Sequence, residues 1–304
     1  MKFTLEFPVN VVDPPGEFQS MPAIREMAEA LEQAGIDACY VTDHPAPDSN
    51  WLKAAFGHDA LDPFAGLAFV AAASSKLLLH TNIVVLPYRN PFVTAKAAAT
   101  VHVLSGGRLI LGVGIGYQKV EFEALGSDFH RRGKLTDEAL AAIRAAWTGG
   151  GVEISGSGFR AQGVEPRPAP NPPPPIWIGG GSEKALDRAA QWGDGWCPFY
   201  AAPGMNKINQ DAGIQSIEHL REQIARLQEK RAALGKTAPF DIALGPRMRI
   251  KRADAASAQR FLDEIGPLQE AGVSWATVEM IHPSRAEYIE LVHWFGEEVV
   301  AKTR

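Results

Sequence analysis

Apolar residues follow two alternating patterns along this chain. Short runs with few charges, such as residues 37–42, are typical of strands that are buried on both faces. Longer segments carry apolar residues at helical spacing, as Ile24, Met27 and Leu31 do. The pattern predicts strands over residues 2–7, 37–42, 77–86, 108–117, 175–178, 195–199, 241–250 and 273–280. It predicts helices over residues 22–34, 63–74, 91–104, 120–125, 137–147, 183–191, 216–234, 256–271 and 284–300.

Strand–helix alternation through a chain of 304 residues is typical of an α/β protein built as a (β/α)8 TIM barrel. A doubly wound parallel sheet is the alternative. Residues 149–175 interrupt the alternation with glycines and prolines, and their middle, residues 152–164, is compatible with a short hairpin. Because the alternation resumes directly afterwards, we interpret this segment as a loop insertion. We therefore expect residues 1–304 to form a single barrel domain.

The fourth predicted strand carries an unusual row of glycines. Gly112, Gly114 and Gly116 alternate, so one face of the strand has no side chains. Glycine weakens a strand unless something must approach the backbone closely. Two interpretations are open: a neighbouring helix packs tightly against this face, or a flat ligand lies over the end of the strand.

Composition narrows the classes of function. A net charge of −5 gives no reason to expect nucleic acid or an anionic membrane surface as a partner. No apolar run reaches the length of a membrane span, and the first residues lack the pattern of a signal peptide. We therefore expect a cytoplasmic protein, with Cys39 and Cys197 as buried free thiols. No sequence motif for a metal or a nucleoside triphosphate is present.

Polar residues directly follow the second predicted strand. In a barrel, the active site lies at the carboxyl ends of the strands, where Asp43 and His44 would stand. Histidine exchanges protons near neutral pH, so His44 is the candidate acid/base residue. A structural histidine is the alternative. The other histidines have no partner pattern, and among them His80 falls within a strand and His102 on a helix.

A glycine-rich turn follows the fifth predicted strand and leads into a helix. It consists of Gly179, Gly180, Gly181 and Ser182. Backbone N–H groups at a helix start attract phosphate, so the turn is a candidate phosphate site. A plain tight turn is the alternative interpretation.

Taken together, six motifs resemble those of the luciferase-like oxidoreductases, in the same order along nearly the whole chain. They are Tyr-Val-Thr-Asp-His at residues 40–44, Leu-Pro-Tyr-Arg-Asn-Pro at 86–91, Leu-Ser-Gly-Gly-Arg-Leu-Ile-Leu-Gly-Val-Gly at 104–114, Glu-Phe-Glu-Ala-Leu-Gly at 121–126, Pro-Ile-Trp-Ile-Gly-Gly at 175–180 and Gly-Asp-Gly-Trp at 193–196. The motifs are specific as a set, although singly they are not. The resemblance implies a barrel, usually a homodimer, that holds FMN or the deazaflavin coenzyme F420.

The resemblance also implies roles for single residues. The Asp-His pair resembles the deazaflavin branch, with His44 as the acid/base and Asp43 in contact with the coenzyme. Asn82 and Ile83 match a bulge that often contains a non-prolyl cis peptide and supports the ring. Further implied coenzyme contacts are Val85, Ile115, Gly116 and the turn formed by Gly179, Gly180, Gly181 and Ser182. Lys184 and Arg188 are placed to meet the acidic tail of the coenzyme, and a solvated helix face is the alternative interpretation. Tyr117 also falls in this site, where some deazaflavin dehydrogenases carry an acidic residue, which argues against a sugar-phosphate substrate.

The function that the sequence favours is hydride transfer between F420 and a small organic substrate. The first alternative is an FMN-dependent monooxygenase whose reduced flavin comes from a separate flavin reductase. The second is a non-catalytic flavin-binding barrel, against which His44 argues. The loops at residues 45–62 and 200–215 are expected to shape the substrate pocket.

Overall fold

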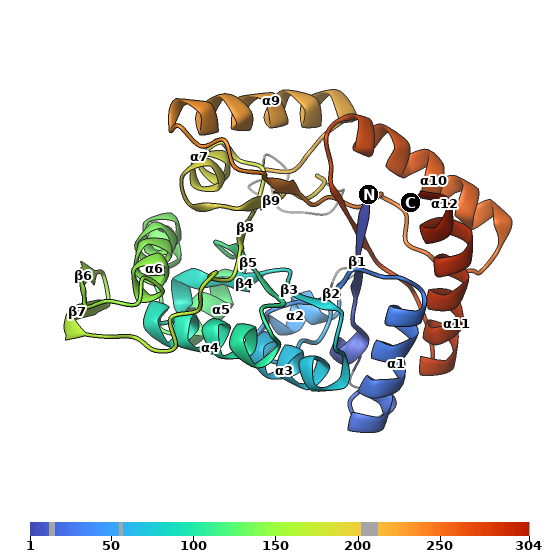
Figure 1. Ribbon diagram of the computed structural model, residues 1–304, viewed down its shortest axis with the longest axis horizontal. Coiled ribbons are helices and arrows are strands. Elements are labelled where there is room, and N and C mark those ends of the chain that lie inside the picture. The colour runs from blue at the N-terminus through green and yellow to red at the C-terminus, as the bar shows by residue number, and fades with distance from the viewer. Residues whose placement is uncertain (12–15, 55–56, 202–211, 304) are drawn as a thin grey trace.

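The computed structural model describes residues 1–11, 16–54, 57–201 and 212–303. Its main sheet is parallel, and the strands pair in the order β10-β9-β8-β5-β3-β2-β1-β11, with β4 beside β5. Helices surround this sheet, as Figure 1 shows. The strands are β1 (Lys2–Glu6), β2 (Ala38–Val41), β3 (Leu78–Thr81), β4 (Val84–Val85), β5 (Leu109–Gly114), β8 (Ile176–Gly179), β9 (Gly195–Cys197), β10 (Asp241–Ile242) and β11 (Trp275–Val278).

The two outer strands of this order meet and close the sheet into a barrel. Ala243, just after β10, forms a parallel bridge with Trp275 of β11. The N–H of Ser274 donates to the carbonyl of Ile242 at 2.9 Å, and that of Leu244 donates to the carbonyl of Trp275 at 3.0 Å. The predicted (β/α)8 barrel is therefore confirmed, and the doubly wound sheet is wrong.

Most helices begin where the sequence supplies a cap, whereas those that begin at Lys119 and Arg132 have no side-chain cap. Asp62 accepts hydrogen bonds from the N–H groups of Phe64 and Ala65 at 3.0 and 2.9 Å, and Pro63 takes the first helical position. The principal helices are α1 (Met21–Gln33), α2 (Ser49–Leu52), α3 (Pro63–Ala73), α4 (Pro91–Leu104), α5 (Lys119–Ala124), α6 (Arg132–Ala146), α7 (Glu183–Trp192), α9 (Ile217–Ala233), α10 (Ala255–Glu270), α11 (Arg285–Phe295) and α12 (Ala301–Thr303). Short 3-10 turns occupy Pro8–Asn10, Leu86–Tyr88 and Phe129–Arg131, and a π-helical segment covers Gly296–Val300. No helix of the described residues is long and apolar enough to cross a membrane.

Side chains alternate between the inside of the barrel and the layer under the helices. Phe3 of β1 packs against Phe295 of α11, with ring centroids 5.4 Å apart. Lys2, Thr4 and Glu6 therefore point into the barrel. Glu6 ends β1 and so places a carboxyl group at the mouth, where the strands have their carboxyl ends.

Aromatic rings fill the lower part of the barrel. The ring of His80 lies 4.8 Å from that of Trp177, which lies 5.3 Å from that of Trp275. Burial lowers the pKa of His80 to about 3, so this histidine is neutral and structural, on the strand where it was predicted. Cys39 and Cys197 are buried free thiols, as predicted, and burial raises the pKa of both.

Two predicted strands differ in extent. The segment predicted as a strand over residues 241–250 forms only two residues of β10, because Gly245 packs against Thr277 and Pro246 lacks an N–H. The segment predicted over residues 77–86 is split into β3 and β4. The break falls at the Asn82–Ile83 peptide, which is cis, as the resemblance implied.

The predicted loops also contain more order than expected. The described part of residues 45–62 holds α2, which Asp48 caps by accepting from the N–H groups of Asn50 and Trp51. The helix predicted from residue 137 begins at Arg132. The predicted hairpin is confirmed as β6 (Val152–Gly156) and β7 (Phe159–Val164), beside α6 at the left of Figure 1. Of the expected pocket loop at 200–215, residues 202–211 lie outside the described residues.

Candidate active site

Asp43 follows β2 and is almost fully buried, with 2% exposure. One carboxylate oxygen accepts from Arg89 Nη2 at 2.6 Å, and the other accepts from Arg89 Nε at 3.1 Å and from the N–H of Val85 at 3.0 Å. Burial raises the pKa of Asp43, and the bonds from Arg89 oppose that change. Asp43 thus ties the end of β2 to β4, so it positions Val85 at the mouth.

His44 is held by its Nδ1 atom. Gln118 Nε2 lies 3.2 Å from this nitrogen, and the carboxylate of Glu121 lies 3.5 Å from it. Both partners are buried and are themselves fixed: Glu121 accepts from the N–H of Ala46 at 3.1 Å, and Gln118 accepts from the N–H of Asp48 at 2.9 Å. Because Nδ1 is engaged, Nε2 is the nitrogen of His44 that can exchange a proton with a ligand.

Aromatic side chains surround the ring of His44. The ring of Trp51 lies 4.4 Å away, that of His58 5.2 Å and that of Tyr117 6.0 Å. His58 Nε2 is also 3.1 Å from the hydroxyl of Thr42. Trp51 and His58 come from the predicted pocket loop, so the structure brings that loop to the predicted acid/base residue.

The glycines of β5 face side chains of the neighbouring strands. A Cβ atom on Gly114 would lie 2.5 Å from Ile83 Cδ1, and one on Gly116 would lie 2.6 Å from Val85 Cγ1. A Cβ on Gly179 would lie 3.4 Å from Ile83 Cγ2. Tight packing is therefore the better interpretation of the glycine row, against neighbouring strand segments and, at Gly116, also against Phe122 of α5. The packing gathers the predicted residues Ile83, Val85, Gly116 and Gly179 at one side of the mouth.

This side of the mouth is partly open to solvent. Asn82 and Ile83 are partly exposed, as are Ile115 and Gly116 after β5. Gly116 has a φ of 71°, a conformation that favours glycine. The side chains of Ile83 and Ile115 are apolar, and the ring of Tyr117, directly after Gly116, lies 6.0 Å from that of His44. The arrangement can hold a flat, partly apolar ring near an acid/base group.

The predicted phosphate turn is present, but its glycine N–H groups are already used. The N–H of Gly180 donates to the carbonyl of Cys197 at 3.1 Å, and that of Gly181 donates to the carbonyl of Ala212 at 3.0 Å. Ser182 caps α7 by accepting from the N–H of Ala185 at 3.3 Å. The donors left for an anion are therefore the first N–H groups of α7, which have no partner within a helix.

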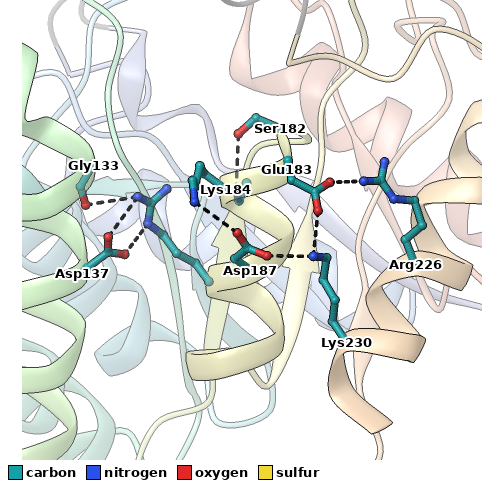
Figure 2. A network of polar contacts seen from close by, with 10 residues as sticks. Gly133, Asp137, Ser182, Glu183, Lys184, Asp187, Arg226 and Lys230 are labelled. Atoms are coloured by element: carbon teal, nitrogen blue, oxygen red, sulfur yellow. Dashed lines mark hydrogen bonds and ion pairs between the residues drawn. The ribbon is translucent and has the colours of Figure 1, made fainter. Parts of the chain in front are cut away.

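Charged side chains of α7 point away from this turn. Figure 2 shows Glu183 directed toward Arg226 and Lys230 of α9. Arg188 is buried and bonds to Asp137 of α6 at 2.6 Å, so the expectation that it meets a coenzyme tail is wrong. Lys184, with 80% of its side chain exposed, pairs with Asp187 at 3.6 Å, and its contact with the tail stays a prediction.

Four residues of the site were not assigned a role from the sequence. Gln118 and Glu121 lie three positions apart at the start of α5, so one helical turn brings both toward His44. Glu121 begins one of the family motifs, and that motif was the feature of the sequence that could have pointed to its role. Trp51 and His58 lie in a segment without periodicity, where spacing predicts no contact with His44.

Glu6 is a further ionisable group at the mouth. Its carboxyl accepts from Asn10 Nδ2 at 2.8 Å. Burial, with a smaller contribution from Glu279, raises the pKa of Glu6 to about 7, although Arg249 opposes the shift. The buried Tyr40 stands opposite Glu6 on β2, and the hydroxyl of the buried Tyr288 donates to the backbone carbonyl of Glu6 at 3.1 Å. A carboxyl group that holds its proton near neutral pH can donate a hydrogen bond at the mouth.

We expect Glu6→Gln to change how stability depends on pH. The folded state keeps the Glu6 proton up to about pH 7, whereas the unfolded chain loses it near 4.5. The free energy of unfolding therefore falls as pH rises between these values. Glutamine stays neutral, so the variant should gain about 3 kcal/mol over the parent above pH 7 and nothing below pH 4. Urea unfolding at pH 5, 6, 7 and 8 measures the free energy of unfolding of both proteins. If this free energy changed with pH equally in the two proteins, the prediction would be contradicted.

The fold and the residues at its mouth define a class of protein. The profile of the luciferase-like monooxygenase family matches residues 1–283, so the chain belongs to this family and is an oxidoreductase. The resemblance stated from the motifs is thereby confirmed.

The proteins that this chain resembles include two F420-dependent enzymes and one monooxygenase. An F420-dependent glucose-6-phosphate dehydrogenase from Beutenbergia cavernae is 34% identical over 310 residues, covering 90% of this chain and 90% of the relative. Among solved structures, an F420-dependent secondary alcohol dehydrogenase in complex with an F420-acetone adduct is 18% identical, with a TM-score of 0.76 and coverage of 100% and 99%. Monooxygenase RslO1 from Streptomyces bottropensis is 19% identical, with a TM-score of 0.72 and coverage of 100% of both chains. At such identities the solved structures show the shared fold alone.

Proposed function

We propose that this protein is an F420-dependent oxidoreductase that transfers a hydride between the deazaflavin and a small organic substrate. The observation that carries the proposal is His44, held through Nδ1 by Gln118 and Glu121 with its other nitrogen left for chemistry. The F420-dependent relative that spans 90% of the chain supports the choice of coenzyme. A barrel that only binds a flavin would have no need for this acid/base arrangement.

The described residues fit such a coenzyme at two places. Ile83, Val85, Ile115 and Gly116 offer an apolar wall for the ring, partly exposed at all of them but the buried Val85, and Asn82 borders it. The first N–H groups of α7, next to the turn of Gly179, Gly180, Gly181 and Ser182, offer donors for a phosphate. When bound, the deazaflavin supplies hydride chemistry.

The remaining groups have roles toward the substrate and the wall. His44 Nε2 takes the proton from a substrate hydroxyl, or returns it to a carbonyl oxygen in the opposite direction. Asp43 acts on the coenzyme site by fixing Val85 and Arg89. Tyr117 packs near both His44 and Trp51 and so borders the substrate. Because Tyr117 is not acidic, we propose a substrate other than a sugar phosphate.

A titration decides between the two coenzymes. The purified protein is titrated with F420 and with reduced FMN, and fluorescence reports binding. Tighter binding of F420 is expected. Tighter binding of FMN would instead support a monooxygenase supplied by a separate flavin reductase. Hydride transfer is then tested with a panel of alcohols, and the change in the absorbance of F420 is the readout.

We also propose that the protein is a homodimer that buries the outer faces of α3 and α4. Helix α3 has no polar side chain, yet Phe69 on its outer face is 53% exposed. On the adjacent α4, Val93 and Leu104 are 68% and 78% exposed. The two helices lie side by side in Figure 1. A helix that is apolar all round is normally buried, so a second copy is the partner that this face fits.

Phe69→Glu is expected to convert the dimer to a monomer, because it places a charge in an apolar contact. Light scattering after size exclusion measures the mass. Leu234→Glu, at a residue of 54% exposure just after α9, is the matched control and should leave the mass unchanged. A parent that is monomeric at micromolar concentration would contradict the proposal.

A further inference from the structure

A carboxylate stands at the place where the anionic coenzyme is proposed to bind. Glu183 is the first residue of α7, directly after the cap Ser182. An acidic residue in the first turn favours the helix itself, but it also repels a second anion at the same end. The carboxylate of Glu183 points toward α9, where Arg226 and Lys230 pair with it (Figure 2).

We propose that Arg226 and Lys230 are positioning residues of the coenzyme site. They hold the Glu183 carboxylate away from the first N–H groups of α7 and neutralise it, so that a phosphate can bind there. This inference rests on the proposed function, since it assigns the phosphate to the start of α7. It concerns side chains that do not themselves touch the phosphate.

The geometry of the pairs supports this role. Glu183 Oε1 lies 2.7 Å from Lys230 Nζ, and the other oxygen, Oε2, pairs with Arg226 Nη2. Both carboxylate oxygens are thus directed toward α9. Residues 226 and 230 are four apart, so one face of α9 presents both cations. Lys230 is also 2.8 Å from Asp187, one turn further along α7.

The charges are present at neutral pH. Hydrogen bonds to Asp187 and Glu183 raise the pKa of Lys230, and the bond to Lys230 lowers the pKa of Asp187. The same region also shapes the turn, because the carbonyl of Ala212, ahead of α9, accepts the N–H of Gly181 at 3.0 Å. The segment before α9 therefore fixes the backbone of the turn, while α9 itself fixes the carboxylate of Glu183 beside it.

The expected effect is large enough to measure. Two unit charges about 6 Å apart at an effective dielectric constant of about 40 change a binding constant about tenfold. We therefore expect the double variant Arg226→Gln, Lys230→Gln to bind F420 about tenfold more weakly than the parent at 20 mM salt. At 1 M salt, where the Debye length is about 3 Å, the difference should disappear.

The decisive variant adds Glu183→Gln to the double variant. Since the repelling charge is then gone, affinity for F420 should return to within about twofold of the parent. Glu183→Gln alone should also bind within twofold of the parent. Arg221→Gln is the matched control, because Arg221 lies on the same helix but pairs with Glu270 of α10 at 3.7 Å.

Two results would overturn the inference. A double variant that binds like the parent would show that Glu183 needs no partner. A triple variant that stays as weak as the double would show that Arg226 and Lys230 act on the ligand directly. Inorganic phosphate serves as a second probe of the site, and the width of its ³¹P signal reports its binding. If the parent binds F420 but the affinities of the variants do not follow the order predicted above, the inference alone fails. If the parent binds neither F420 nor phosphate, the proposed function fails with it.

Discussion

His44→Ala should bind F420 as tightly as the parent and turn over at least about a hundredfold more slowly. General acid/base groups contribute factors of this size, since without one the substrate oxygen must exchange its proton with water. The ring of His44 is held from one side by Gln118 and Glu121. Its removal therefore leaves the apolar wall and the start of α7, where the coenzyme is proposed to bind, in place.

The measurement is a comparison of F420 affinity and turnover in the same preparation. Turnover within a few-fold of the parent would remove His44 from the mechanism. Loss of affinity together with turnover would instead assign His44 to coenzyme binding. Glu121→Gln is the companion variant: it keeps the shape but loses the charge near Nδ1, so it should shift the pH profile of turnover and leave F420 affinity unchanged.

The sequence predicted those parts of the site that depend on strand order. Asp43 and His44 lie at the mouth because they follow a parallel strand, and the carboxyl ends of all such strands face one way. Asn82 and Ile83 fall at a real break between β3 and β4. The placement of Asp43 and His44 needs only the periodicity of the chain and the handedness of its crossovers, whereas the break at Asn82 and Ile83 was implied by the family resemblance alone.

The remaining parts of the site depend on contacts between segments far apart in the chain. Trp51 and His58 reach His44 through the path of an irregular loop, which leaves no periodic signal. Glu6 acquires its raised pKa from burial and from Glu279, which directly follows the neighbouring strand β11 but lies 273 positions later in sequence. Local patterns cannot report such effects, because burial is a property of the assembled barrel.

The glycine row shows the same limit in another way. Alternation of Gly112, Gly114 and Gly116 correctly indicated a close approach to the backbone of β5. It did not indicate which neighbour approaches, because a ligand, a helix and a strand all need the same missing side chains. The structure places Ile83 against Gly114 and Val85 against Gly116, whereas Gly112 faces Thr81 and His80.

Gly180→Asp is expected to abolish coenzyme binding, with a loss in affinity of at least about a hundredfold, while the barrel stays folded. Gly180 lies just ahead of α7, and a Cβ atom there would be 3.4 Å from Ala185 Cβ, in the first turn of the helix. A carboxylate at this position can accept hydrogen bonds from the first N–H groups of α7, as an N-terminal cap does. It would then occupy the donors proposed for the phosphate and repel that anion.

The backbone of Gly180 requires a control for strain. Its φ is 99°, so any side chain costs roughly 1–2 kcal/mol of stability whatever its charge. Gly180→Asn has the same shape as the aspartate variant and tolerates this conformation comparably, but it carries no charge. We expect the asparagine variant to share the lowered stability and to retain most of its affinity for F420. If both variants bind F420 like the parent, the phosphate lies elsewhere, and the loops after β10 and β11, where barrels often bind phosphate, become the site to test.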